Sequence, residues 1–243
     1  DPPAASPTST FSPTPHPTPT FAPEQIGSLV SPEEAAFLAG HEIWSGDETR
    51  PKIMMTYDDF GTEEQIDKIL AAFRQVGGKA TFFYLGDHLL RSARSIERIV
   101  AGGHQLGCHG YFHEQPLTNL SAGEVEAQFE QYFRDVAQIV PGYRVRFFRA
   151  PFGAINEEVR AQAARWGMQS VRWSFSSDGL TPKTRKIVQA NASNGAIVLS
   201  HIYRYFDYMH ADRITLLLVE SGYQLVTVAD GIKDSDRFTP PTG

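Results

Sequence analysis

The sequence predicts one α/β domain built on a parallel β-sheet and preceded by an extended linker. From residue 52 onward, about seven short apolar runs alternate with helical patterns. Strands that are separated by helices run parallel, either in a barrel or in a doubly wound sheet. With 243 residues, of which 41% are hydrophobic, the chain can bury one core of this kind.

The first 23 residues differ in composition from the rest. They hold eight of the 16 prolines, interleaved with Ser and Thr, and their only formal charge is Asp1. Such a tract buries too little apolar surface to offset the entropy of ordering. We therefore expect a disordered Pro/Thr-rich linker over 1–23 and a folded domain over 24–243. The start at Asp1, without Met or an apolar leader, is expected if an upstream segment was removed.

The first half of the chain alternates clear helix and strand signals. Ser31, Thr62 and Ser121 stand where helix N-caps are expected, the last two with Gln or Glu three residues later as in a capping box. Gly pairs at 77–78 and 102–103 end two helices. The predicted elements are helix 31–38, strand 53–57, helix 62–76, strand 80–84, helix 95–101, strand 105–108 and helix 121–139.

The second half repeats the same unit. Thr181-Pro182 has the form of an N-cap followed by proline at the first helical position. A Leu-rich pattern predicts a later helix, and β-branched runs predict the strands. The predicted elements are strand 146–148, helix 156–166, strand 169–173, a helix from 181, strand 196–200, helix 213–221 and strand 224–228.

Ionisable side chains follow five of the predicted strands. In parallel α/β folds the functional site lies at the carboxyl ends of the strands, where the loops converge. Glu and Lys are instead scattered over the chain. The residues concerned are Asp58 and Asp59 after the first strand, His109 and His113 after the third, Arg149 after the fourth, Asp178 after the fifth and His201 after the sixth.

Each of these features also has a purely structural explanation. Adjacent carboxylates often form a solvated turn, Arg149 could be a surface residue, and His201 could be a hydrogen-bonded core histidine. His109 and His113 are spaced so that both imidazoles can reach one metal ion, but a metal needs a third ligand. All the structural explanations would have to hold at once, so the combination favours a functional site.

Other polar residues serve as controls. Strand alternation places Cys108 opposite His109, which predicts a small buried hydrophobic side chain. His104 precedes the strand and is predicted to be structural. The residues expected in loops that line the mouth of the site, without clear partners, are Asp87, His88, Asp207 and His210.

Four segments resemble, in order and spacing, the motifs of polysaccharide deacetylases, which form carbohydrate esterase family 4 with its NodB-like domain. They are residues 56–59, 103–113, 148–153 and 197–201. Residues 78–83 and 222–228 are similar to connecting segments of that family, so the resemblance extends from about 52 to 232. It implies a distorted (β/α) barrel and metal-dependent removal of N- or O-acetyl groups from a polysaccharide.

The resemblance also implies a role for each strand-end residue. Two imidazoles and one carboxylate leave a divalent ion with net positive charge and open positions; zinc is expected, and cobalt or nickel would suit similar ligands. A backbone N–H beside Phe152 would help to stabilise an oxyanion. The implied catalytic groups are Asp58 as base, Arg149 holding it and His201 as acid; the metal ligands are Asp59, His109 and His113; the lining residues are Phe152, Pro151, Tyr57, Leu199 and Trp173.

Two segments depart from the family pattern. Phe60-Gly61-Thr62 replaces the usual Gly-Pro after the first motif, which reshapes the loop beside the metal. Around the fifth strand the family usually has a Trp, two Asp and a second Trp. Here Asp178 stands a residue early, and Gly179 takes the place of the second Trp. We expect Asp178 to orient His201 and the loss of the Trp to open the acetyl pocket.

These observations predict a secreted or surface-tethered, extracytoplasmic enzyme. Its expected substrate is an N-acetylglucosamine polymer of the peptidoglycan or chitin type. The net charge of −6 argues against nucleic acid, no apolar run is long enough for a membrane span, and the expected state is a monomer. The alternatives are an acetylxylan esterase, a non-catalytic glycan-binding module that keeps the metal site, and a hydrolase of small-molecule amides.

Overall fold

A computed structural model describes residues 30–240, so the predicted linker over 1–23 and the boundary at residue 24 lie outside the described residues. The strands are β1 (Lys52–Asp59), β2 (Thr81–Tyr84), β3 (Gln105–Cys108), β4 (Phe147–Phe148), β5 (Gln169–Ser170), β6 (Phe175–Ser176), β7 (Ile197–His201) and β8 (Gln224–Leu225). The helices are α1 (Pro32–Gly40), α2 (Glu63–Gln75), α3 (Ala93–Ala101), α4 (Ala122–Ile139), α5 (Glu157–Arg165), α6 (Thr184–Asn191), α7 (Tyr205–Met209), α8 (Ala211–Glu220) and α9 (Val228–Gly231).

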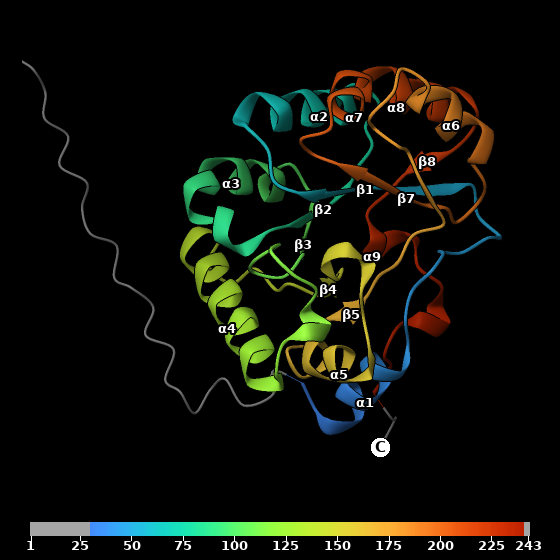
Figure 1. The fold of residues 1–243 in the computed structure, drawn as a ribbon. Coiled ribbons are helices and arrows are strands. Elements are labelled where there is room, and N and C mark those ends of the chain that lie inside the picture. The colour runs from blue at the N-terminus through green and yellow to red at the C-terminus, as the bar shows by residue number, and fades with distance from the viewer. Residues whose placement is uncertain (1–29, 241–243) are drawn as a thin grey trace, which may run out of the picture.

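All strand pairs are parallel, in the order β5-β4-β3-β2-β1-β7-β6, and β8 pairs with the start of β1. The sheet curls, and its helices pack around it (Figure 1). β5 and β6 are successive in sequence but lie at opposite ends of the strand order, and no ladder joins them within residues 30–240. The fold is therefore an open, distorted (β/α) barrel, which confirms the predicted fold class.

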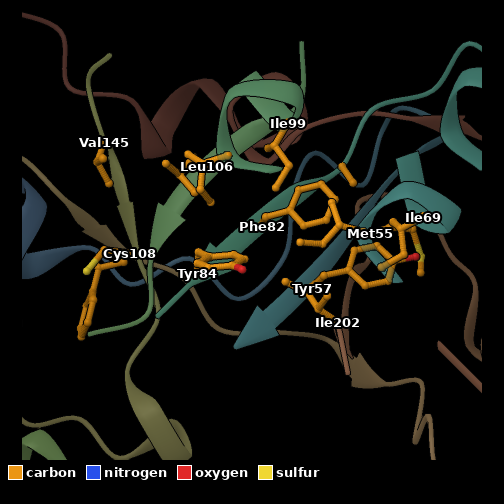
Figure 2. Packing of buried hydrophobic residues seen from close by; sticks show 14 of the residues in the cluster. Met55, Tyr57, Ile69, Phe82, Tyr84, Ile99, Leu106, Cys108, Val145 and Ile202 are labelled. Carbon is orange, nitrogen blue, oxygen red and sulfur yellow. The ribbon is translucent and has the colours of Figure 1, made fainter. Parts of the chain in front are cut away.

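Alternation along the strands divides the apolar residues between two cores. Met55, Tyr57 and Phe82 point outward into the larger core beneath the helices, of which Figure 2 shows a part. Met54 and Phe83 point inward into a smaller core, which α9 closes through Val228. The inner face of the barrel is thus filled at one end by apolar side chains, and its other end is left to polar ones.

The strand predictions differ from the structure at three places. Residues 224–228 form only a two-residue strand, because Thr227 caps α9 and its side chain accepts from the Asp230 N–H. The fifth strand ends at Ser170, after which Val171 bridges Ile43. β6 was not predicted, since two residues are too few for a periodic signal. The structure therefore has eight strands in residues 30–240 instead of about seven.

Most helices begin where the caps predict. Thr62 and Ser121 both form complete capping boxes, and Ser31 caps α1, which packs against α5 on the outside. Thr181 does not cap α6 directly; its hydroxyl accepts from the Lys183 N–H, and the helix begins at Thr184. None of the helices in residues 30–240 is long and apolar enough to cross a lipid bilayer.

Candidate active site

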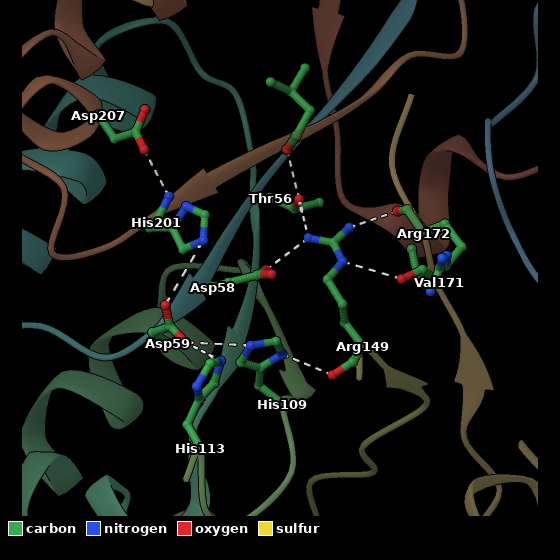
Figure 3. Close-up of polar contacts among 11 residues, drawn as sticks. Thr56, Asp58, Asp59, His109, His113, Arg149, Val171, Arg172, His201 and Asp207 are labelled. Atoms are coloured by element: carbon green, nitrogen blue, oxygen red, sulfur yellow. Dashed lines mark hydrogen bonds and ion pairs between the residues drawn. The ribbon is translucent and has the colours of Figure 1, made fainter. Parts of the chain in front are cut away.

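The inward-pointing positions at the carboxyl ends of four strands carry Asp58, His109, Arg149 and His201. Thr56 and Asp58 follow Met54 on the inner face of β1, and Arg149 follows the inner residue Phe147. The register places Asp58 beside His201 on β7. Figure 3 shows these side chains facing one another together with His109. Strand alternation, which has a period of two, explains this convergence.

Asp59 reaches the site by a different route. Alternation would send its side chain outward with Tyr57, but Asp59 has a φ of 73°, in the left-handed region. This conformation is uncommon outside glycine and clusters at functional sites. It turns the chain at the end of β1, and the Asp59 carboxylate faces His109 and His113 (Figure 3). Two adjacent carboxylates therefore enter the same site.

Asp59, His109 and His113 fit a metal ion by geometry. Their ligand atoms all lie within 4.8 Å of one another. Asp59 Oδ1 is 3.4 Å from His109 Nε2 and 3.6 Å from His113 Nε2. Ligands of a tetrahedral ion with bonds of about 2.1 Å are about 3.4 Å apart. Among residues 30–240, Asp59 Oδ1 is also buried without a hydrogen-bond partner, as expected of an atom that binds a cation.

A backbone contact prepares His109 to act as a ligand. Its Nδ1 lies 2.8 Å from the Arg149 carbonyl oxygen and must donate to it, which leaves the Nε2 lone pair directed at Asp59. Burial lowers the pKa of His109, but Asp58 and Asp59 raise it more, so the net shift is upward. Burial raises the pKa of Asp59, yet the imidazoles of His109, His201 and His113 hold it below its usual value. The cluster thus favours an ionised Asp59 next to a positive charge.

Arg149 is fully buried, and all three guanidinium nitrogens have partners. Its Nη1 donates to Asp58 Oδ1 at 2.7 Å and to Thr56 Oγ1 at 2.6 Å. Its Nε and Nη2 donate to the carbonyls of Val171 and Arg172 at 3.2 and 2.8 Å. Thr56 in turn donates to the Val198 carbonyl at 2.7 Å. These contacts fix the Asp58 carboxylate and bring together the pair that the sequence predicted.

His201 has a carboxylate neighbour that sequence reasoning did not assign. Asp207, on α7, accepts from the His201 backbone N–H at 2.8 Å and from the Ser177 hydroxyl at 2.6 Å. It is buried, and burial raises its pKa to about 6. Asp207 was expected in a loop at the mouth of the site; α7 places it beneath His201 instead. A helix of only five residues gives little periodic signal in sequence.

The predicted partner of His201, Asp178, lies elsewhere. Its side chain accepts from the Thr181 hydroxyl at 3.0 Å, and among the described residues it has no hydrogen bond with His201. The neighbouring Gly179 explains the rearrangement: a Cβ there would lie 2.2 Å from Asp207 Oδ2. Gly179 therefore leaves the space that the Asp207 carboxylate fills. The expectation that Asp178 orients His201 is not supported by this geometry.

Of the five predicted lining residues, one points away from the site and four lie beside it. Tyr57 does not line the site, because alternation turns it outward to stack on Phe82 in the larger core. Phe152 is 57% exposed, has a φ of 60° and lies 4.2 Å from the His113 ring. Trp173 lies inward, and its ring would be 2.8 Å from a Cβ on Gly153.

Pro151 and Leu199 are both buried beside the site. Pro151 begins the turn that presents Phe152, and its ring would be 3.2 Å from a Cβ on Gly110 of the His109 loop. Leu199 precedes His201 on the same inward face of β7. Their positions agree with a lining role, which stays a prediction.

Both controls are as predicted. Cys108 is buried in the larger core, and burial raises the pKa of its thiol. His104 is buried, and its Nδ1 accepts from the Ala80 N–H at 3.1 Å, so the residue is structural. Of the other mouth residues, His88 stacks on Phe60, with ring centroids 3.5 Å apart.

Comparisons with known proteins agree with the fold and the motifs. A family model described as polysaccharide deacetylase matches residues 45–171. The peptidoglycan-N-acetylglucosamine deacetylase PgdA of Listeria monocytogenes is 30% identical over 184 residues, which are 74% of this chain and 38% of that protein. This chain thus spans less than two fifths of that relative.

Two solved structures are similar over most of the described chain. Peptidoglycan deacetylase PdaC from Bacillus subtilis has 31% identity and a TM-score of 0.69, covering 76% of this chain and 91% of that one. A mutant of BA3943, described as a pseudoenzyme of carbohydrate esterase family 4 with restored enzymatic activity, has 26% identity and a TM-score of 0.74. It covers 80% of this chain and 72% of that one.

Proposed function

The chain belongs to the polysaccharide deacetylase family, and on that premise we propose that it is a metal-dependent hydrolase that deacetylates N-acetylglucosamine-containing polysaccharide of the peptidoglycan or chitin type. The observation that carries the proposal is the Asp59, His109 and His113 cluster beside the buried Arg149–Asp58 pair. A metal site next to a fixed carboxylate suits metal-assisted hydrolysis of an acetyl group, since the metal can polarise the carbonyl and the carboxylate can take a proton from water.

The metal ligands in this proposal are Asp59, His109 and His113. A divalent ion held there, zinc by the preference of this ligand set, would act as a Lewis acid on the acetyl carbonyl and make water a stronger nucleophile. The hydrogen bond from His109 to the Arg149 carbonyl keeps one imidazole in the tautomer that a ligand needs.

Asp58 is the proposed base. Its Oδ1 is held by Arg149, which leaves Oδ2 to take the proton from the attacking water. Because Thr56 and two backbone carbonyls hold the guanidinium, the carboxylate needs little reorganisation during the reaction. Beside Phe152, the left-handed turn sets the direction of the backbone N–H groups proposed to stabilise the oxyanion.

His201 is the proposed acid, on the opposite side of Asp58 from Arg149 (Figure 3). Burial lowers its pKa to about 4, so the imidazole is neutral at pH 7 in the free protein. It must therefore gain a proton during the reaction before it can protonate the leaving nitrogen. The proton that Asp58 removes from water is the nearest source, and Asp207 holds the His201 backbone in place meanwhile.

The proposed location is outside the cytoplasm. Relatives with names such as peptidoglycan-N-acetylglucosamine deacetylase act on a cell-wall polymer, and the Pro/Thr-rich composition of residues 1–23 suits a tether. A polymer of that size would be met outside the cell.

The test is release of acetate. We expect the zinc-loaded protein to release acetate from N-acetylglucosamine oligomers and peptidoglycan faster than from acetylated xylan. Asp58→Asn should abolish release and keep one bound zinc by elemental analysis, whereas His109→Ala should lose both. Acetate from no substrate, or full activity in Asp58→Asn, would contradict the proposal.

A second candidate is a glycan-binding module without turnover. It is favoured by the likeness to BA3943, whose unmutated form is described as a pseudoenzyme, and by the altered segments at 60–62 and 173–179. This candidate predicts oligosaccharide binding by the zinc-loaded protein without acetate release, and equal affinity in Asp58→Asn.

A further inference from the structure

We propose that Phe60 and Tyr203 form a stacking platform for the pyranose ring whose acetamido group enters the site. This inference rests on the proposed function, because it names the part of the protein that binds the sugar. Phe60 directly follows Asp59 at the end of β1, and Tyr203 lies two residues after His201 at the end of β7. Both side chains therefore lie at the rim of the same site.

The two rings are neighbours, and the Tyr203 ring also lies beside that of His201. The Tyr203 ring centroid is 5.8 Å from that of His201 and 6.5 Å from that of Phe60. Phe60 is 37% exposed and Tyr203 is 46% exposed. Exposed aromatic side chains are not unusual singly, but two adjacent ones beside a catalytic site indicate a ligand surface.

The Phe60 ring is held in place before any ligand arrives. His88 stacks on it at 3.5 Å with an interplanar angle of 9°, which covers one side of the ring. The remaining exposure of Phe60 is then available to a ligand, and little rotamer entropy is lost on binding.

The backbone under the platform is fixed as well. The Ile202 N–H donates to the Asp58 carbonyl at 3.1 Å. Gly61 lies so close to Ile202 that a Cβ at residue 61 would be 2.3 Å from Ile202 Cγ2. The segment that carries Phe60 is thus packed directly on the segment that carries Tyr203.

The chemistry of the proposed reaction places the sugar on the same side of the site as His201 and Tyr203. The group that leaves is the amine of the sugar, and its proton comes from His201 in the proposed mechanism. The pyranose ring attached to that nitrogen must therefore lie on the His201 side, where Tyr203 is. A divalent ion held by Asp59, His109 and His113 would bind the carbonyl oxygen at the other end of the same acetamido group.

An N-acetylglucosamine ring suits an aromatic platform. Its faces carry C–H groups, which are weakly positive, whereas the face of an aromatic ring is negative. Such packing needs no charge on the ligand. The proposed occupant is therefore an uncharged pyranose of the substrate chain.

Binding should be measured apart from catalysis. In the full chain with Asp58→Asn and bound zinc, calorimetry with the N-acetylglucosamine pentamer gives the dissociation constant. We expect Phe60→Ala and Tyr203→Ala each to weaken pentamer binding by roughly 3- to 10-fold, given the usual strength of aromatic contacts. Phe60→Trp should restore most of it.

Leu216→Ala is the matched control, because Leu216 is 50% exposed but lies on α8. It should bind the pentamer like the parent. In the otherwise wild-type enzyme, Phe60→Ala should raise KM for the pentamer more than it lowers kcat. The platform is contradicted if Phe60→Ala and Tyr203→Ala each change the dissociation constant of the pentamer by less than twofold. It is also contradicted if the parent protein does not bind the pentamer.

The platform and the proposed function can fail separately. Platform-dependent binding without acetate release from the wild type would support the platform and contradict the hydrolase. Acetate release with unchanged KM and affinity in both alanine variants would support the hydrolase and contradict the platform.

Discussion

The space at Gly179 and the carboxylate of Asp207 depend on each other. Gly179 has a φ of 60° and touches Asp207, and Asp207 supports the backbone of His201. Asp207 lies 28 positions further along the chain than Gly179. Only the fold shows that a small residue at one position makes room for an acid at the other.

Gly179→Ala should therefore impair both folding and turnover. The left-handed conformation costs an alanine about 1–2 kcal/mol, and the Cβ would also displace the buried carboxylate. Gly222→Ala is the control for strain alone, because Gly222 has a φ of 91° and no other part of the described chain lies within 4 Å of its Cβ position. In urea unfolding, we expect the free energy of unfolding to fall by about 1–3 kcal/mol more in Gly179→Ala than in Gly222→Ala. We also expect Gly179→Ala to have a lower kcat. Equal losses would show that Asp207 does not need this space.

Sequence reasoning found the ionisable residues at the strand ends but did not assign the buried carboxylate of Asp207. Asp58, Arg149 and His201 occupy inward positions at strand ends, so a period of two suffices to bring them together. Asp59 joins them only through its positive φ; its position at a strand end and the motif resemblance predicted it, whereas alternation alone would turn it outward. Asp207 depends on a helix of five residues, which is too short for a pattern to reveal.

At the scale of elements, α4 positions the loop that carries His113. Gln128 Oε1 accepts from the N–H groups of Tyr111 and Phe112 at 3.1 and 3.2 Å. The Tyr111 hydroxyl donates to Asp135 on the same helix at 2.9 Å. A metal ligand on a loop is thus tied to a helix of 18 residues.

Gln128→Leu should weaken zinc binding, because two loop N–H groups lose their acceptor. Groups that orient metal ligands typically change affinity by about 10- to 100-fold, and we expect the lower end here. Gln128→Glu keeps an acceptor oxygen and should stay near the wild-type affinity. Competition with a chromogenic chelator measures both. If Gln128→Leu binds zinc as tightly as Gln128→Glu, the loop that carries His113 keeps its conformation without the hydrogen bonds to Gln128.

The alternation of helices and strands was enough to predict a parallel sheet, and the family resemblance a barrel, but neither predicted the ends of that barrel. Long amphipathic helices such as α2 and α4 gave both a period and a cap. β5, β6 and β8 have two residues each, so pairing with longer neighbours, not their own sequence, makes them strands. The closing segments of a distorted barrel are therefore its least predictable part.

For the whole molecule, two buried groups at opposite ends of the barrel give stability opposite dependences on pH. Asp207, near the carboxyl ends, has its pKa raised to about 6 by burial, so it adds stability as the pH falls below that value. His104, near the amino ends, has its pKa lowered to about 4 by burial and, to a lesser extent, by Lys79. The fold holds it neutral between Ala80 and the rings of Phe73 and Phe82.

The sign for His104 follows from linkage. Its folded pKa lies below the unfolded value of about 6.5, so its contribution is present above pH 6.5 and is lost as the pH falls toward 4, in total about 3 kcal/mol. His104→Asn keeps an acceptor for the Ala80 N–H but cannot titrate. Between pH 7 and pH 4.5, the free energy of urea unfolding should therefore fall less in His104→Asn than in wild type. The Asp207 contribution is the same in both proteins and cancels in this difference. Parallel losses in the two proteins would mean that His104 is protonated in the native state without cost, and that its burial does not govern acid stability.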